Sequence, residues 1–233
     1  MSPTRPTSRA RPRARAPAGL ALAATLAVGL AGPAAASTSS ATASILRAGQ
    51  ITRADVPPTW SHSKQIDTLR SLPRVDACRP IAAASAAARR HLPRRLSATF
   101  IAPGSAGVTF AENTVYAFPS ARAAAAYLSV FQAPGARTCF TAVFQHALAK
   151  LRATVTVVPV TTLAGSSDAS VGYEGTLATH DAQGTPVTVV FDLAAVTVGR
   201  AFVGFDFSNV TVALPEGPAL VQAVTARLRG TGA

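Results

Sequence analysis

Three acidic residues in the second half of the chain could form one row of carboxylates. Glu174, Asp192 and Asp206 each lie among alternating apolar residues that indicate β-strands. A turn centred on Gln183 would place Glu174 opposite Asp192, and a turn centred on Gly199 would place Asp192 opposite Asp206. Because like charges directly opposite destabilise a sheet, the row predicts either arginines that neutralise it or a cation or ligand site. A bulge in the middle strand would instead shift the register and divide the row.

The densest charge feature is a run of basic residues near the end of a predicted helix, and it consists of Arg89, Arg90, Arg94 and Arg95. Such a run could bind anions, such as the phosphate groups of wall polymers or of acidic lipids. It also suits a helix C-terminus, where arginines oppose the helix dipole and stay solvated. No aromatic residues interleave the arginines, which argues against nucleic acid as a partner.

The sequence shows no catalytic motif. Its four histidines, His62, His91, His146 and His180, form neither H-E-x-x-H nor another metal-ligand spacing. The serine-rich residues 165–168 lack the G-x-S-x-G pattern of hydrolases and indicate a turn. We therefore predict no catalytic residues, no bound metal and no cofactor. The alternative is a hydrolase whose Ser, His and Asp converge only in the folded chain.

Residues 1–36 have the organisation of a secretory signal peptide. Five arginines and no acidic residue precede an apolar run over 18–31, and small residues close the segment at Ala36. We predict cleavage between Ala36 and Ser37, a flexible leader over 37–44 and a single domain over 45–230. The apolar run is too short to span a bilayer. The mature protein is thus expected to be secreted or extracytoplasmic, in the cell envelope, without a membrane-spanning segment.

The two cysteines, Cys78 and Cys139, lie 61 residues apart at the expected starts of two helices. Disulfides persist outside the cytoplasm, and an exported chain with an even number of cysteines favours pairing. The chain has no C-x-x-C motif, and His146 lies two turns beyond Cys139, which disfavours a reactive or metal-binding thiol pair. We predict one structural disulfide that contributes about 4 kcal/mol to stability.

Composition is compatible with one folded domain. The full chain carries a net charge of +12, and removing the five arginines of the signal peptide leaves 17 basic against 10 acidic residues, or +7. All of that excess lies within residues 47–95. Because 48% of the residues are apolar and only 14% are charged, the chain can build a hydrophobic core, and global disorder is not expected.

Periodicity predicts an α+β fold. Apolar residues at helical spacing indicate helices over 79–92, 120–131, 140–151 and from Pro215 to residue 228. Strands are expected over 96–102, 107–118, 154–161, 171–178, 187–198 and 203–212. The apolar phase reverses near Ala194 and Ala195, which predicts a bulge there. Hairpins segregated from helices indicate a largely antiparallel sheet packed by helices, with one disulfide, and not a doubly wound fold.

Four short motifs together resemble one known family. They are Ala54-Asp55-Val56-Pro57 before Trp60, the wide spacing of Cys78 and Cys139, residues 115–120 before an alanine-rich helix, and Val198-Gly199-Arg200. The sequence over about residues 45–229 resembles the PknH-like extracellular sensor domain, an actinobacterial family found outside receptor kinases and as free exported proteins. The resemblance implies a helix-backed antiparallel sheet with a ligand-binding cleft. Family members often carry a second disulfide, for which this chain has no cysteines.

These observations predict an exported, non-catalytic, sensor-like domain that binds a small ligand or an anionic component of the cell envelope. We expect a monomer that does not bind nucleic acid. A secreted hydrolase and a purely structural envelope protein are the alternatives. A binding module should show a cleft lined by apolar groups, whereas a hydrolase should bring a histidine and a carboxylate within hydrogen-bond reach in such a cleft.

Overall fold

The structure of the protein is a computed structural model. It describes residues 32–65, 75–105, 109–147, 153–161, 163–165, 167–180 and 184–233. The signal peptide predicted over residues 1–36 therefore lies almost entirely outside the described residues.

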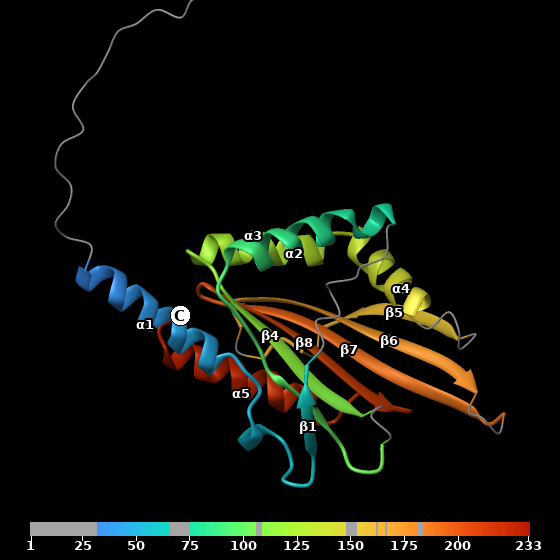
Figure 1. The fold of residues 1–233 in the computed structure, drawn as a ribbon. Helices are drawn as coiled ribbons and strands as arrows, with labels where there is room; N and C mark the ends of the chain where they lie inside the picture. Colours follow the sequence, from blue (N-terminus) through green and yellow to red (C-terminus); the bar gives the residue numbers. More distant parts are fainter. Residues whose placement is uncertain are drawn as a thin grey trace, which may run out of the picture.

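The described residues build an antiparallel sheet of eight strands (Figure 1). The strands are β1 (Ser61–Lys64), β2 (Arg94–Leu96), β3 (Ala98–Ile101), β4 (Phe110–Ala117), β5 (Thr154–Val160), β6 (Ala169–His180), β7 (Pro186–Val198) and β8 (Ala201–Val210). Their spatial order is β1-β3-β4-β8-β7-β6-β5, and β2 also pairs with β4. All the pairs are antiparallel, and β4, β8 and β7 occupy the middle of the sheet.

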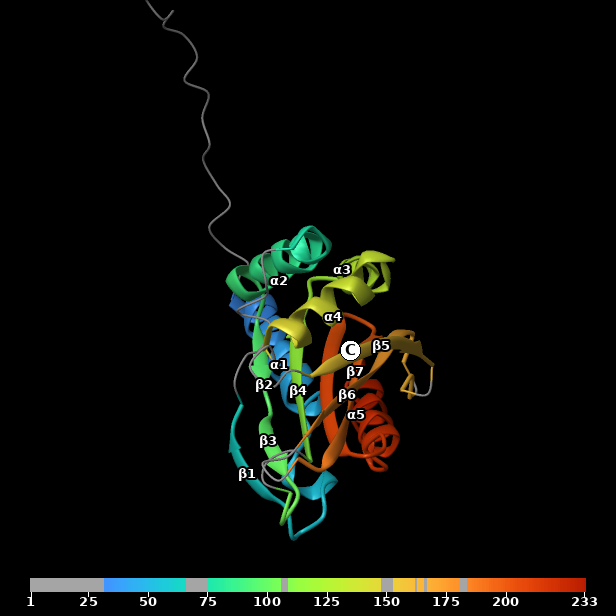
Figure 2. The same cartoon turned by 90° about the vertical axis from the view of Figure 1, so that its right-hand side faces the viewer.

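Helices cover both faces of this sheet (Figures 1 and 2). One face carries α2 (Arg79–His91), α3 (Ala121–Gln132) and α4 (Gly135–Ala147), and the other carries α1 (Gly32–Ala48) and α5 (Gly217–Gly230). Short 3-10 turns, η1 (Arg53–Asp55) and η3 (Asp76–Cys78), follow α1 and precede α2. The predicted fold class, a largely antiparallel sheet packed by helices with one disulfide, is confirmed.

Helix boundaries follow local sequence signals. The side chain of Ser120 accepts a hydrogen bond from the backbone N–H of Ala123 and caps α3. Pro80 lies in the first turn of α2, where its missing N–H costs nothing. The same helix ends just before Pro93, because proline cannot donate the hydrogen bond that would continue it.

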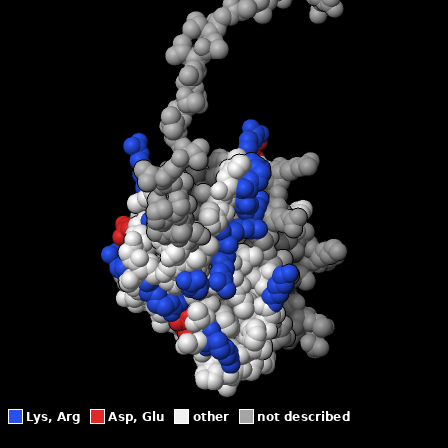
Figure 3. Space-filling view, turned by 60° about the vertical axis from the view of Figure 1, so that its left-hand side comes forward, with Lys and Arg blue, Asp and Glu red and all other residues white. Residues whose placement is uncertain are grey.

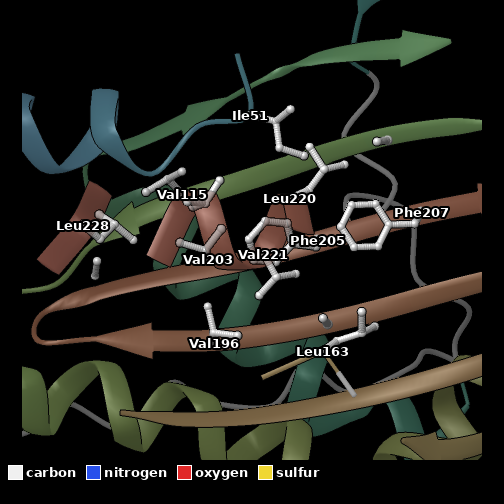
Figure 4. Close-up of a cluster of buried hydrophobic side chains, with 14 of the residues drawn as sticks. Ile51, Val115, Leu163, Val196, Val203, Phe205, Phe207, Leu220, Val221 and Leu228 are labelled. Atoms are coloured by element: carbon white, nitrogen blue, oxygen red, sulfur yellow. The ribbon is translucent and has the colours of Figure 1, made fainter. Parts of the chain in front are cut away.

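Two hydrophobic cores lie on opposite faces of the sheet. The α5-side core joins the sheet to α1 and α5, and Figure 4 shows its centre, where Leu220 and Val221 of α5 lie near Val203 and Phe205 of β8. The α3-side core joins the sheet to α2, α3 and α4. Its principal large members are Ile81, Tyr116, Phe118, Tyr127, Leu128, Phe131, Phe140, Tyr173, Phe191 and Phe202.

Arg227 of α5 holds the end of α1 in place. Its guanidinium donates to the carbonyls of Ala48 and Gln50, at 3.2 and 2.6 Å, and to both carboxylate oxygens of Asp55, at 2.6 and 3.0 Å. Burial alone would raise the pKa of Asp55, but hydrogen bonds from Arg227 and Thr52 outweigh it and hold that pKa below 3.8. The segment after α1 is thereby attached to the α5-side core.

The predicted bulge near Ala194 and Ala195 is wrong. Strand β7 pairs with β6 and with β8 in an unbroken register through these residues. Its apolar phase reverses because helices cover both of its faces: Val196 belongs to the α5-side core, whereas Phe191 belongs to the α3-side core. A strand buried on both faces does not need to keep one apolar phase.

The flexible leader predicted over 37–44 is also corrected, since these residues form part of α1. The helix continues into Ile45, which is 2% exposed in the α5-side core. Thr42 accepts a hydrogen bond from the guanidinium of Arg200 at 3.2 Å. Small polar residues have only moderate helix propensity, so it is this packing that stabilises them as a helix.

Candidate ligand-binding site

A cavity of about 430 Å³ lies between the sheet and helices α3 and α4. Its floor comes from strands β4, β6, β7 and β8, and its roof from Tyr127 and Phe131 of α3 and Phe140, Val143 and Phe144 of α4. This volume falls in the range of roughly 300–1,000 Å³ that is usual for small-molecule sites. The cavity is therefore large enough for an organic ligand.

Three rows of cross-strand partners from β7, β8 and β4 make up the centre of the floor. The rows are Leu193, Asp206 and Glu112, then Ala195, Gly204 and Thr114, then Phe202 and Tyr116. The middle row has only small side chains, between a row that ends in two carboxyls and a row of aromatic rings. A Cβ added to Gly204 would meet its nearest neighbour, the ring of Phe202, at 3.6 Å. The missing side chain at Gly204 thus helps to hollow the floor.

Aromatic rings dominate the wall. The ring centroids of Tyr127 and Phe202 lie 4.7 Å apart in an edge-on arrangement, and those of Tyr127 and Phe131 lie 5.2 Å apart. The Tyr173 hydroxyl donates to the carbonyl of Phe131 at 2.7 Å, and the Tyr127 hydroxyl hydrogen-bonds Ser85 at 3.3 Å. Both hydroxyls therefore have protein partners, and these residues offer the cavity mainly apolar ring surface.

Two carboxyls form the polar end of the cavity. Glu112 of β4 is directly opposite Asp206 of β8, and both line the cavity. The Thr99 hydroxyl donates to Glu112, and the Gln65 side chain also hydrogen-bonds it. Burial raises the pKa of Glu112, and these two hydrogen bonds only partly offset that rise.

Asp206 is the more perturbed of the two acids. Burial raises its pKa to about 8, with further contributions from the charges of Glu112 and Asp192. No hydrogen bond or ion pair from another described residue lowers this pKa. At neutral pH the two carboxyls therefore favour holding one proton between them.

The predicted row of three carboxylates is divided between the two faces of the sheet. Glu174 lies opposite Asp192, so this part of the prediction is confirmed. The placement of Asp206 opposite Asp192 is wrong, because Asp192 pairs with Phe207. The β7–β8 turn contains two residues, 199 and 200, so the register differs by one residue from a turn centred on residue 199. A one-residue shift moves a side chain to the other face, and Asp206 faces α3 and α4.

Glu174 and Asp192 remain together on the α5 side. Asp192 is 4% exposed, and burial, followed by the charge of Glu174, raises its pKa to about 6. A backbone hydrogen bond from Leu214 acts in the opposite direction. No arginine contributes to this shift, so the neutralising arginine expected from the sequence is not seen among the described residues.

The arginine run lies where α2 passes into β2. Arg89 and Arg90 belong to the last turn of α2, and Arg94 and Arg95 belong to β2. Arg90, Arg94 and Arg95 are exposed and Arg89 is half-buried. On the face that Figure 3 shows, basic side chains outnumber acidic ones. None of the four is among the described residues that line the cavity.

The disulfide between Cys78 and Cys139 is confirmed, with a Cα–Cα distance of 4.7 Å and both residues fully buried. It joins η3, directly before α2, to α4. The next residue of α4, Phe140, lines the cavity. The disulfide therefore fixes part of the cavity roof to the turn that precedes α2.

The four histidines are dispersed over the fold. His62 lies in β1, His91 at the end of α2 and His180 at the end of β6, while His146 of α4 lines the cavity. Within the described ranges no three His, Cys, Asp or Glu residues are arranged to hold a metal ion. No serine is among the described residues that line the cavity.

Sequence reasoning missed Glu112 and Gly204. Glu112 lies in a strand sequence whose residues 110, 111 and 115–118 are apolar, and an acid in such a strand signals a polar site. Gly204 lies between Phe202 and Asp206 in the phase opposite to Val203, Phe205 and Phe207, and glycine inside a strand can mark a close approach by a ligand. Both signals were visible in the sequence, but their meaning depends on which face of the sheet the cavity occupies.

Comparisons with known proteins relate this chain to a solved structure by its fold and not by its sequence. No protein-family model matches the sequence, and no curated protein matches it either. The crystal structure of the extracellular domain of PknH from Mycobacterium tuberculosis matches with a TM-score of 0.52 at 12% sequence identity, covering 79% of this chain and 95% of that one. The resemblance expected from the sequence motifs is thus confirmed as a shared fold. No helix of the described residues is long and apolar enough to cross a membrane.

Proposed function

We propose that this chain, which has the fold of the PknH extracellular domain, is an exported monomeric domain that binds a small, mainly apolar molecule in the cavity between the sheet and helices α3 and α4. The observation that carries this proposal is the cavity itself, about 430 Å³ in volume and walled largely by aromatic rings. The disulfide supports an extracytoplasmic location, where such bonds persist.

The groups that line the cavity support binding more than catalysis. His146 and the two carboxyls are the titratable groups with catalytic potential among the described lining residues, and neither serine nor cysteine accompanies them. A hydrolase of the Ser-His-Asp type needs a nucleophile within hydrogen-bond reach of a base. We therefore assign no catalytic residue.

Filling the cavity tests this function. Wild-type protein should bind the apolar fluorophore N-phenyl-1-naphthylamine, whose emission increases in an apolar site. Gly204→Leu should weaken that binding by about tenfold or more, because the new side chain occupies space that the middle row leaves open. Gly204→Ala should weaken it less, since it adds a single carbon.

Gly135→Leu is the matched control. It makes the same substitution at the first residue of α4, where a Cβ would lie 3.8 Å from the carbonyl of Ala77 and away from the cavity lining. The control should keep wild-type binding, and thermal melts should show that each variant is folded. Equal fluorophore binding by wild type and a folded Gly204→Leu would refute the cavity as the site.

We also propose that the arginine run contacts an anionic component of the envelope. Three of its four side chains are exposed within one continuous stretch of chain, which suits contact with an extended anionic surface. The run lies apart from the described cavity lining. This contact is therefore separable from ligand binding.

A further inference from the structure

The polar end of the cavity offers acceptors without a matching cation. Asp206 and Glu112 are direct partners on β8 and β4, a placement that destabilises a sheet when both are charged. The described residues that line the cavity include no lysine or arginine. No other described residue donates to Asp206 in a way that lowers its pKa.

A third acceptor lies beside this pair. Gln65 lines the cavity, and its side chain hydrogen-bonds Glu112. Its amide nitrogen also donates to the Thr114 hydroxyl at 3.5 Å. Its carbonyl oxygen, Oε1, is buried and has no hydrogen-bond partner among the described residues. A buried acceptor without a donor is costly, so this end of the cavity suits a group that brings several N–H donors.

The surrounding walls restrict the kind of cation. Divalent metals such as calcium prefer six or more oxygen ligands. The polar end of the cavity offers the two carboxyls, the amide oxygen of Gln65 and the hydroxyl of Thr114, beside aromatic rings. The faces of such rings attract organic cations. The aromatic rings of Tyr116 and Phe202 lie two rows from the carboxyls across the small middle row. A ligand with an ammonium group at one end and an apolar body would contact both regions.

We propose that the ligand of this cavity is an apolar primary amine, whose ammonium group donates hydrogen bonds to Asp206, Glu112 and Oε1 of Gln65 while its apolar body lies against the aromatic wall. A primary ammonium has three N–H donors, one for each of these acceptors. When both carboxyls are ionised, the positive charge of the ammonium group takes the place of the proton that they otherwise share and offsets their repulsion. This inference rests on the proposed function and specifies the chemical class of its ligand.

Three probes with the same ring test the inference: 2-naphthylmethylamine, 2-naphthylmethanol and 2-naphthoate. They are cationic, neutral and anionic at pH 8.5, and each is titrated against bound N-phenyl-1-naphthylamine. In wild-type protein the amine should bind about tenfold or more tightly than the alcohol, and the carboxylate should bind most weakly. Asp206→Asn and Glu112→Gln should each lose about tenfold in affinity for the amine and keep affinity for the alcohol within about threefold.

Asp192→Asn is the matched control. It also neutralises a buried carboxyl, but this carboxyl lies on the α5 side and outside the cavity lining. The control should keep the preference for the amine. If amine and alcohol bind equally well to wild type, or if a folded Asp206→Asn keeps the preference, the amine inference is overturned while the proposed function stands. If neither the fluorophore nor any probe binds, both are overturned.

Discussion

The raised pKa values of Asp206 and Asp192 make the stability of the fold depend on pH. The pKa of Asp206 is raised, mainly by burial, from 3.8 to about 8, so the folded protein holds a proton that the unfolded chain releases near pH 4. This contribution to stability is fully present below about pH 4 and is lost as the pH rises to about 8. Protonated Asp192 also stabilises the fold, but this contribution is lost as the pH rises to about 6.

Because Asp206 and Asp192 titrate over different pH ranges, mutation can separate the contribution of Asp206 to stability from that of Asp192. Between pH 6 and 8 the free energy of unfolding of the wild type should fall by about 1 kcal/mol per pH unit, the slope of roughly one proton. In Asp206→Asn the free energy of unfolding should change much less over this range, because an amide cannot ionise. Urea denaturation at pH 6, 7 and 8 measures the slopes, and Asp192→Asn should leave the slope in this range nearly unchanged. Parallel slopes for wild type and Asp206→Asn would contradict the assignment.

Among the elements, α4 is attached to the rest of the fold by a covalent bond. This helix supplies Phe140, Val143 and Phe144 to the cavity roof, and the disulfide links its residue Cys139 to Cys78 before α2. The chain closed by this bond spans 61 residues. Loop-closure entropy for such a span corresponds to about 4 kcal/mol. The same bond thus contributes to global stability and to the position of the cavity roof.

Replacing both cysteines by serine should reveal both effects. The melting temperature should fall by roughly 10 °C, given about 2–4 °C per kcal/mol for a chain of this size. At temperatures well below the melting transition, the affinity for N-phenyl-1-naphthylamine should also fall, because α4 gains freedom to move away from the sheet. Calorimetry and fluorophore titration at 20 °C measure these changes. An unchanged melting temperature would show that packing alone fixes α4.

At the scale of the whole molecule, the predicted cleavage of the signal peptide bears on α1. The predicted cleavage between Ala36 and Ser37 falls within this helix, which runs from Gly32 to Ala48. Cleavage there would keep the part of α1 that carries Thr42 and Ile45, whose contacts with Arg200 and the α5-side core are described above. The mature chain would therefore retain its docking to α5.

N-terminal sequencing checks this prediction directly. Protein recovered from the medium or envelope of a secreting host should begin at Ser37 or within a few residues of it, because Ala34 to Ala36 offer the small residues that signal peptidase requires. A cleavage-site variant, Ala36→Leu, should accumulate as the longer precursor. Recovery of only the full-length wild-type chain, from the cytoplasm, would rule out the signal peptide.

Local sequence signals predicted most of the helices and strands. Ser120 and the apolar spacing that follows it predicted α3, and Leu220, Val224 and Leu228 predicted the buried side of α5. These predictions succeed because capping and amphipathic periodicity act over one or two helical turns. The disulfide followed from the compartment that the predicted signal peptide implies and from the even number of cysteines.

Only the tertiary structure decided where the cavity lies and which acids it contains. The face of Asp206 depends on one residue in the β7–β8 turn, and the alternation of apolar residues does not report turn length in a strand buried on both faces. Glu112 meets Asp206 because β4 lies beside β8, 94 residues later in the chain, in the middle of the sheet. The sequence by itself thus determined most of the elements, the disulfide and the expected export. The tertiary structure determined the site, because long-range strand pairing brings together residues that no local pattern relates.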